Sequence, residues 1–294
     1  MERRLIINAD DFGMTEGISE GIIKAHLEGV VTSTTLMANM PAAAYAIKLA
    51  QKTPDLGVGI HLNLTTGRPI STPEKVRTLV DKSGTFYPQK ILISRLVKWK
   101  IDRLEILAEF TAQIEKALEL GLFPTHLDSH HHIHLYPIVT WAFLKVAEKF
   151  SIYKMRTHRL QILIDRNYKN AALVKLLYWR KAILDSPKIL YKTLVHQILV
   201  RKNMILPHYI IAPNLVLPAS KNDNLQNNWM RALSLLPMCN SEISCHPGYV
   251  SDELKNLTVL TEHREEELEL LISSGIKESI MSNQIELITY KKLV

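Results

Sequence analysis

Short apolar segments alternate along the chain with longer segments in which apolar residues recur every three or four positions. Leu5–Ile7, Thr32–Met37 and Val58–Ile60 are short and aliphatic or β-branched, as is typical of buried strands. Residues 17–27 have helical spacing, and Pro41 fits the first turn of a short helix. This alternation of strands and helices predicts βα units and a mainly parallel sheet.

The clearest helix is predicted to begin at Asp102 and to end at Gly121. The spacing of Asp102 and Glu105 suits a capping box, and Gly121 suits the left-handed residue that often follows a helix. The apolar stripe predicted to face the core consists of Leu104, Leu107, Ala108, Ile114 and Leu118.

The second half of the chain continues the alternation. Strands are predicted at Thr125–Leu127, Tyr153–Arg156 and Glu242–Cys245, a helix at Pro137–Lys149, and a closing helix from about Thr261 to Gly275. A length of 294 residues suits a single α/β barrel, so we predict one domain over residues 1–294.

The amino-acid composition indicates the broad class of protein. Hydrophobic residues make up 47% and charged residues 22%, as in ordinary soluble domains. We find neither a signal peptide at the start nor an apolar run near the roughly 18 residues of a membrane span. The two cysteines, Cys239 and Cys245, are too few for a disulfide framework. The expected location is therefore the cytoplasm.

The net charge of +7 is concentrated in one segment. Residues 166–202 contain nine Lys and Arg and a single acid, Asp185, among many apolar residues. We predict a basic helical insert at about 160–210. Two interpretations stay open: a subdomain packed on the barrel, or peripheral contact with an anionic membrane at its inner face. Nucleic acid is not an expected partner, because the chain has no recognition motif and the acids described next would repel phosphates.

Acids and histidines follow the predicted strands. Asp10 and Asp11, His61, the tract 126–134, and His246 all lie where a strand runs out into a loop. In barrels and open α/β sheets that edge is where ligands bind. We therefore expect these side chains to gather in one site.

Each cluster taken alone has a simpler interpretation. The acid pair fits a surface turn, His61 a hydrogen-bonded core residue, and His246 an ordinary loop. The tract 126–134 holds five of the twelve histidines and fits a loop with incidental metal affinity. Two imidazoles and one carboxylate, however, form a common catalytic metal site with open positions, and not all five histidines can bind one ion.

The motifs NADDFG (8–13), HLNLT (61–65), THLDSHHHIH (125–134) and SCHPGY (244–249) decide between these interpretations. In this order they resemble the YdjC-like carbohydrate deacetylases, which include the chitooligosaccharide deacetylases. The resemblance covers roughly residues 4–158 and resumes near 240. It implies a distorted (β/α) barrel of the glycoside hydrolase/deacetylase type that removes N-acetyl groups from amino sugars.

The resemblance also implies roles for single residues. The metal ligands fall on Asp11, His61 and His130, and the general base falls on Asp10. His246 matches a motif histidine near the site, and we expect it to protonate the departing amine. Two further residues belong to the expected surroundings of the metal: Asp128 is expected to orient a histidine ligand, and His126 either to do the same or to contact substrate.

The metal and the substrate are less closely defined. The resemblance favours Mg²⁺, whereas two imidazoles and one carboxylate suit Zn²⁺ better. The segments VTSTTLMANMPA (31–42) and VGIHLNLTTGRPI (58–70), with the basic region, are similar to the hopanoid-biosynthesis-associated branch. That similarity implies an N-acetylglucosamine linked to a membrane lipid, as an alternative to a soluble oligosaccharide.

Two other functions compete with sugar deacetylation. One is a metal-dependent hydrolase of another amide or of a phosphoester, which would use the same ligands. The other is a non-catalytic protein that binds metal or sugar. Asp10 speaks against the second, because a ligand set of Asp11, His61 and His130 leaves that carboxylate without a task. The sequence leaves monomer and homodimer equally open.

Overall fold

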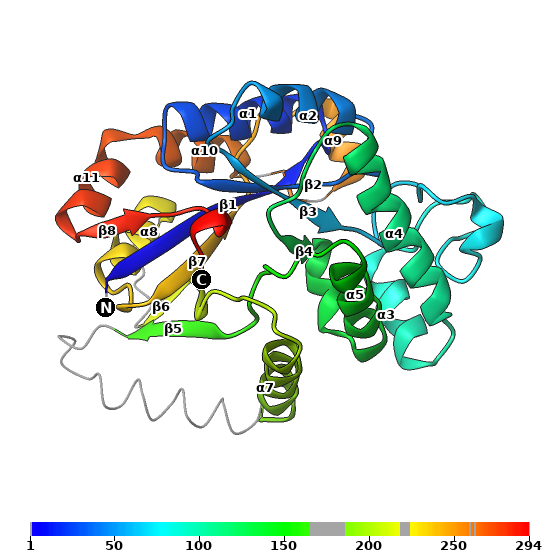
Figure 1. Ribbon diagram of the computed structural model, residues 1–294. Helices are drawn as coiled ribbons and strands as arrows, with labels where there is room; N and C mark the ends of the chain where they lie inside the picture. Colours follow the sequence, from blue (N-terminus) through cyan, green and yellow to red (C-terminus); the bar gives the residue numbers. More distant parts are fainter. Residues whose placement is uncertain (1, 165–185, 218–223, 259, 262, 294) are drawn as a thin grey trace.

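A parallel sheet organises the molecule in the computed structural model (Figure 1), which describes residues 2–293 except 165–185, 218–223, 259 and 262. Its strands follow the order β4-β3-β2-β1-β7-β6-β5, and β8 pairs with the start of β1. The strands are β1 (Arg3–Phe12), β2 (Ser33–Leu36), β3 (Gly57–Leu62), β4 (Leu127–Ser129), β5 (Leu160–Ile164), β6 (Tyr209–Leu217), β7 (Asn240–Cys245) and β8 (Ile285–Leu287).

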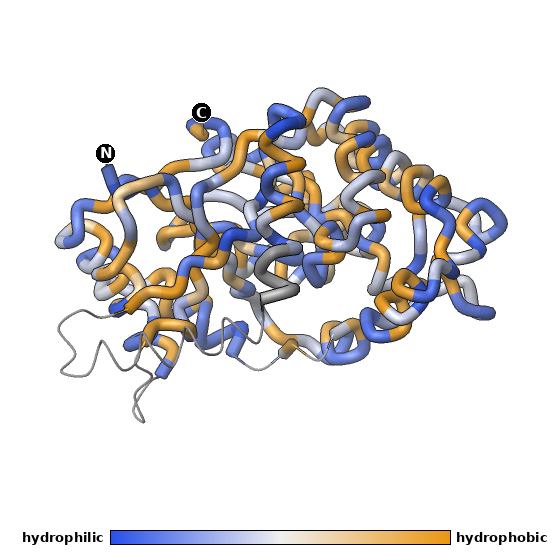
Figure 2. Tube along the Cα trace, turned by 90° about the horizontal axis from the view of Figure 1, so that it is seen from below, coloured by the Kyte–Doolittle hydropathy of each residue, from blue (hydrophilic) through white to orange (hydrophobic). Residues whose placement is uncertain are grey.

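Helices cover the outside of this sheet (Figure 1). They are α1 (Glu16–Leu27), α2 (Ala43–Gln51), α3 (Gln89–Val97), α4 (Arg103–Glu119), α5 (Pro137–Lys149), α7 (Ser186–Arg201), α8 (Leu225–Ser234), α9 (Asp252–Leu257), α10 (Arg264–Ile272) and α11 (Ser274–Ser282). Helices α1, α2 and α10 lie on one side of β1 to β3, and α4 and α5 lie beside β4. The tube in Figure 2 shows hydrophobic stretches through the middle and hydrophilic ones in outer loops.

The sheet is curled into an incomplete barrel. Beyond β4, Met155 forms an isolated parallel bridge with Leu127, and the next residues lead directly to β5 at the other edge of the sheet. The α/β barrel expected from the sequence is thus confirmed, with one difference. Tyr153–Arg156 makes only isolated bridges, and the regular strand of this region is β5.

The inside of the barrel changes from apolar to polar along β1. Because side chains alternate along a strand, Ile6, Asn8 and Asp10 share one face. Ile6 packs there against Tyr290 and Leu293 of the C-terminal segment. That segment fills the lower end of the barrel, while the polar side chains lie toward the carboxyl ends of the strands.

Helix α4 differs from its predicted orientation. Asp102 accepts from the backbone N–H of Leu104, as an N-cap should, but Glu105 bonds to Thr78 rather than closing a capping box. Leu104 is 59% exposed, and Ala108 is also exposed. The helix is turned so that its buried face carries Ile106, Glu109, Phe110, Gln113, Ile114 and Ala117.

Buried polar side chains explain that rotation. Glu109 accepts hydrogen bonds from the backbone N–H groups of Ile70 and Ser71, and Gln113 bonds to the backbone of Asn63. These contacts satisfy the backbone hydrogen-bonding groups of the loop that follows β3, so the helix buries two polar residues in place of two apolar ones.

The closing helix also differs from its prediction. Helix α10 begins at Arg264, and Ser273, the N-cap of α11, separates the two helices.

The predicted basic insert lies partly outside the described residues. Residues 165–185 are not described, 160–164 form β5, and 186–201 form α7. Helix α7 buries Val195 and Leu199 against the body of the protein.

Candidate active site

The end of β1 is irregular exactly where its two acids lie. Its pairing with β2 shifts register between Ala9 and Phe12, and Asp11 has a φ of 70°. A bulge of this kind turns the side chains that follow it, and a non-glycine residue at positive φ is uncommon. As a result, the adjacent carboxylates of Asp10 and Asp11 meet different partners.

Asp11, His61 and His130 bring three ligand atoms together. Asp11 Oδ1 lies 3.2 Å from His130 Nδ1 and 3.7 Å from His61 Nε2, and the two nitrogens are 3.3 Å apart. All three residues are buried. Ligand atoms around a tetrahedral zinc ion, with bonds of about 2.1 Å, lie about 3.4 Å from one another, so the observed spacing fits a bound ion.

The hydrogen bonds around these three residues leave the converging atoms available. His61 Nδ1 lies 2.6 Å from Asp128 Oδ1, which directs Nε2 toward Asp11. Arg264 Nη2 donates to Asp11 Oδ2 at 2.6 Å, and Asp11 Oδ1 makes no hydrogen bond within the described residues. A buried carboxylate oxygen without a donor is the expected state of a metal ligand.

The charges also favour a cation at this position. Burial lowers the pKa of His61, but the nearby charge of Asp128 and its hydrogen bond, with further contributions from Asp10 and Asp11, raise it to about 9. Burial raises the pKa of Asp11, but the adjacent His130, whose Nδ1 lies 3.2 Å from Asp11 Oδ1, and the charge of Arg264 outweigh burial and hold the pKa well below its usual range.

Asp10 makes a two-pronged ion pair. Arg156 Nη1 and Nη2 donate to its two carboxylate oxygens at 2.8 and 2.6 Å, and Asn8 Nδ2 donates at 2.9 Å. Burial opposes ionisation of Asp10, but the charge and hydrogen bonds of Arg156 hold its pKa well below the usual range. Asp10 is therefore ionised at neutral pH and fixed in orientation.

Arg156 also makes a second possible ion site less favourable. Asp10, His61 and Asp128 form another group of potential ligands. The same guanidinium lies 3.0 Å from Asp128 and 2.8 Å from Glu242, so a positive charge already lies beside these carboxylates. The triad with Asp11 and His130 is the better candidate.

His246 is a further neighbour of Asp10. It follows β7, its side chain is 35% exposed, and its Nε2 lies 3.9 Å from Asp10 Oδ2. The backbone N–H of His246 donates to Glu267 Oε2 at 2.6 Å, which ties this loop to α10. An accessible imidazole beside a fixed carboxylate can exchange a proton with a bound substrate.

His126 has different surroundings from those of an exposed substrate contact. It is fully buried, its ring stacks on Tyr290 with centroids 3.7 Å apart, and its Nε2 lies 3.2 Å from Asn8 Oδ1. Through Asn8 it connects to Asp10 rather than to a metal ligand.

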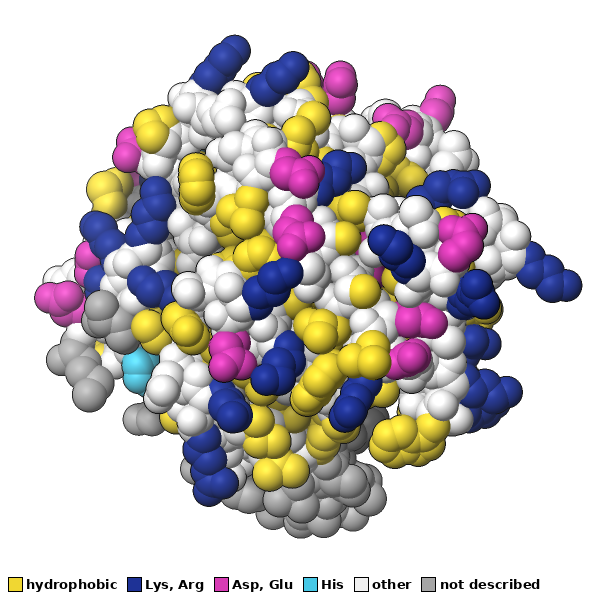
Figure 3. Space-filling view, turned by 45° about the vertical axis from the view of Figure 1, so that its right-hand side comes forward, with side chains coloured by type: hydrophobic (Ala, Val, Ile, Leu, Met, Phe, Trp, Pro, Cys, Tyr) yellow, Lys and Arg dark blue, Asp and Glu magenta, His cyan; other side chains and the backbone are white. Residues whose placement is uncertain are grey.

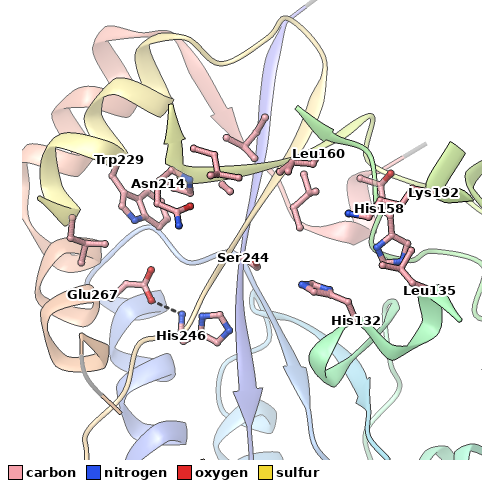
Figure 4. Close-up of a pocket in the computed structure, with 17 residues that line it drawn as sticks. His132, Leu135, His158, Leu160, Lys192, Asn214, Trp229, Ser244, His246 and Glu267 are labelled. Carbon is pink, nitrogen blue, oxygen red and sulfur yellow. Dashed lines mark hydrogen bonds between the residues drawn. The ribbon is translucent and has the colours of Figure 1, made fainter. Parts of the chain in front are cut away.

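A cavity of about 440 Å³ lies beside His246 (Figure 4). His246 and Glu267 lie on one side of it, and His132, His158 and Lys192 on the other. Much of the remaining lining is apolar and includes Leu160, Ile210, Pro213, Leu215, Leu225 and Trp229. The cavity offers space for a substrate beside His246, whose Nε2 lies 3.9 Å from Asp10 Oδ2.

Sequence reasoning missed the two arginines that support the site. Arg156 closes a predicted strand and Arg264 lies near the start of the predicted closing helix, and both are buried. The position of Arg156 at the end of a predicted strand was a sequence signal that it could belong to the site. The sequence around Arg264 contains no such signal, because only the tertiary fold brings α10 beside β1.

Comparisons with known proteins find relatives over nearly the whole chain. A family model described as YdjC-like protein matches residues 4–282. A carbohydrate deacetylase of Thermoanaerobacter pseudethanolicus is 32% identical, over 98% of each chain. A carbohydrate deacetylase of Clostridium beijerinckii is 34% identical, over 99% of this chain and 100% of that protein.

One solved structure has the same fold over nearly the whole chain. It is a protein of Enterococcus faecalis to which cellobiose-phosphate cleavage is ascribed. It has a TM-score of 0.76 and 29% sequence identity, and it covers 99% of this chain and 98% of that one.

Proposed function

The chain belongs to the YdjC-like protein family, and from this premise we propose that it removes the N-acetyl group from an acetylated amino sugar. One observation carries the proposal: Asp11, His61 and His130 converge beside the separate carboxylate of Asp10. The relatives named as carbohydrate deacetylases support the choice of substrate class.

We assign the metal to Asp11, His61 and His130. Two imidazoles and one carboxylate suit zinc, and the family resemblance suits magnesium, which prefers oxygen ligands. We propose zinc for tight binding. A divalent ion there would polarise the amide carbonyl and acidify a water molecule. Elemental analysis of protein purified without added metal tests this, and a zinc content near zero would contradict it.

The protein's own residues divide the remaining tasks. Asp10, held by Arg156, accepts the proton of the water whose oxygen adds to the amide carbon. His246 gives a proton to the sugar nitrogen as the C–N bond breaks, which releases acetate and the free amine. Asp128 and Arg264 hold His61 and Asp11 in orientation.

Acetate release from a panel of N-acetylated sugars and glycolipids, with and without chelator, tests the function. We expect turnover on at least one sugar, loss with chelator and recovery with added metal. Turnover confined to phosphoesters or other amides would favour a different hydrolase. Metal and sugar binding without any acetate would indicate a non-catalytic protein.

A lipid-linked sugar is the form of substrate that the surroundings of the site favour. The cavity has an apolar wall that a bare oligosaccharide would not need. Nearby, α7 exposes Leu194, Ile198 and Val200 and ends at Arg201, which Lys202 follows. Figure 3 shows hydrophobic side chains interspersed with Lys and Arg, and with a few Asp and Glu, on the lower part of one face. Apolar and basic surface of this kind binds anionic membranes.

None of the described helices is long and apolar enough to cross a bilayer. From the exposed apolar and basic residues around α7 we propose peripheral contact with a membrane, and co-sedimentation with vesicles of anionic lipid tests it. Binding should weaken at least tenfold when Arg201 and Lys202 are changed to Gln, whereas changing the distant Lys48 and Lys52 should have no effect. Absence of binding at low salt would contradict membrane contact.

A further inference from the structure

The turn after β4 contains two consecutive residues in the left-handed region. His131 has φ 56° and ψ 22°, and His132 has φ 52° and ψ 33°. Residues other than glycine are disfavoured in this region because their Cβ atom comes close to the following carbonyl oxygen, whereas glycine, which has no Cβ atom, adopts it freely. Two such histidines in succession, directly after His130, are a local strain, and strain of this kind is concentrated at functional sites.

His131 has a visible use. Its Nδ1 lies 2.9 Å from Thr65 Oγ1, and its ring lies 3.9 Å from that of His130. It thus supports the ring of a proposed metal ligand, and this contact accounts for its backbone.

His132 has no such contact. Its side chain is exposed to the cavity, and among the residues that the structure describes its only ring neighbour is His158, edge-on at 6.1 Å. Within the described residues its imidazole makes no hydrogen bond. In Figure 4 it lies across the cavity from His246. A polar side chain is held in a strained turn and directed at the space where a substrate would lie.

We propose that His132 is a sugar-binding residue, which hydrogen-bonds a hydroxyl group of the substrate on the wall opposite His246. The inference rests on the proposed function. A neutral imidazole offers one donor and one acceptor, the combination that complements a hydroxyl group. Binding through a hydroxyl that does not react affects KM rather than kcat.

His132→Gly separates this role from a structural one. The change removes the imidazole and relieves the backbone, so we expect Tm to stay equal or rise by about 2 °C. We expect KM to rise at least tenfold, kcat to stay within about threefold, and metal content to be unchanged. Gln284→Gly is the matched control, since Gln284 has φ 52°, is exposed and lies before β8 at the opposite end of the barrel. It should raise Tm similarly and leave KM unchanged.

Calorimetric binding of N-acetylglucosamine and di-N-acetylchitobiose to the metal-loaded protein separates this inference from the proposed function. Weaker binding by His132→Gly supports the inference, and if the wild type binds without releasing acetate, only the proposed function fails. An unchanged KM and affinity, a Tm lower by more than about 5 °C, a loss of metal, or no sugar binding by the wild type would each overturn the role of His132.

Discussion

Arg156 is the residue on which the buried charges of the site depend. It lies within 3.0 Å of Asp10, Asp128 and Glu242, and its side chain is fully buried. Removing one partner of a buried ion pair leaves the other charge uncompensated in a medium of low dielectric constant. The guanidinium therefore stabilises the fold and the orientation of Asp10 together.

We predict that Arg156→Gln lowers the free energy of unfolding by about 3–5 kcal/mol, because three acids lose their common partner. Urea denaturation measures this. Arg4→Gln is the control: Arg4 pairs with Glu286 at the surface, and its loss should cost less than about 1 kcal/mol. Equal losses in the two variants would contradict the role given to Arg156.

At the scale of elements, the loop that carries His246 is held by helices distant in sequence. Glu267 of α10 accepts from the backbone of His246, and Gly21 of α1 lies directly against Gly248. A Cβ atom at position 21 would be 2.5 Å from Gly248 Cα, which is too close for any side chain. The position of His246 thus depends on close packing of α1.

We predict that Gly21→Ala reduces acetate release at least tenfold and destabilises the protein by about 1–3 kcal/mol, even though alanine favours helices. Gly275→Ala is a matched helical control. The nearest atom to its new Cβ is the flexible end of Met230 at 3.5 Å, so stability and activity should change little. Normal activity in Gly21→Ala would show that the His246 loop tolerates displacement.

The strand ends that carry the site follow from the sequence, because runs such as Leu5–Ile7 fit buried parallel strands. The strands β5, β6 and β8 do not follow from it, and β5 lies within the segment predicted as a helical insert. The side of α4 that faces inward does not follow from it either. Glu109 and Gln113 are buried by hydrogen bonds to a loop some forty residues earlier, and no local pattern contains that information. Arg264 was missed for the same reason.

At the scale of the molecule, buried neutral histidines make stability depend on pH. Burial lowers the pKa of His126 to about 3, and it lowers the pKa of His134 and His158 well below the usual value. In the unfolded chain these groups titrate near 6.5, so below that pH the unfolded state binds more protons than the native state. Stability must therefore fall as pH falls from about 6.5.

We predict that the metal-free protein loses up to about 1.4 kcal/mol of stability per pH unit for each such histidine between pH 6.5 and 5. Urea denaturation in the presence of chelator at several pH values measures the slope. His134→Asn should reduce it by up to that amount, whereas His208→Asn, at an exposed position, should leave it unchanged. Equal slopes in wild type and His134→Asn would contradict a neutral buried His134.

The central claim is that Asp11, His61 and His130 hold a metal ion while Asp10 performs the proton transfer. The most direct test is to measure acetate release and bound metal together in wild type and Asp10→Asn. We predict about one ion per chain in both proteins and a loss of at least about a hundredfold in turnover for the variant. Near-normal turnover with metal bound would contradict the assignment of Asp10 as the base, and loss of the metal would contradict its separation from the ligands.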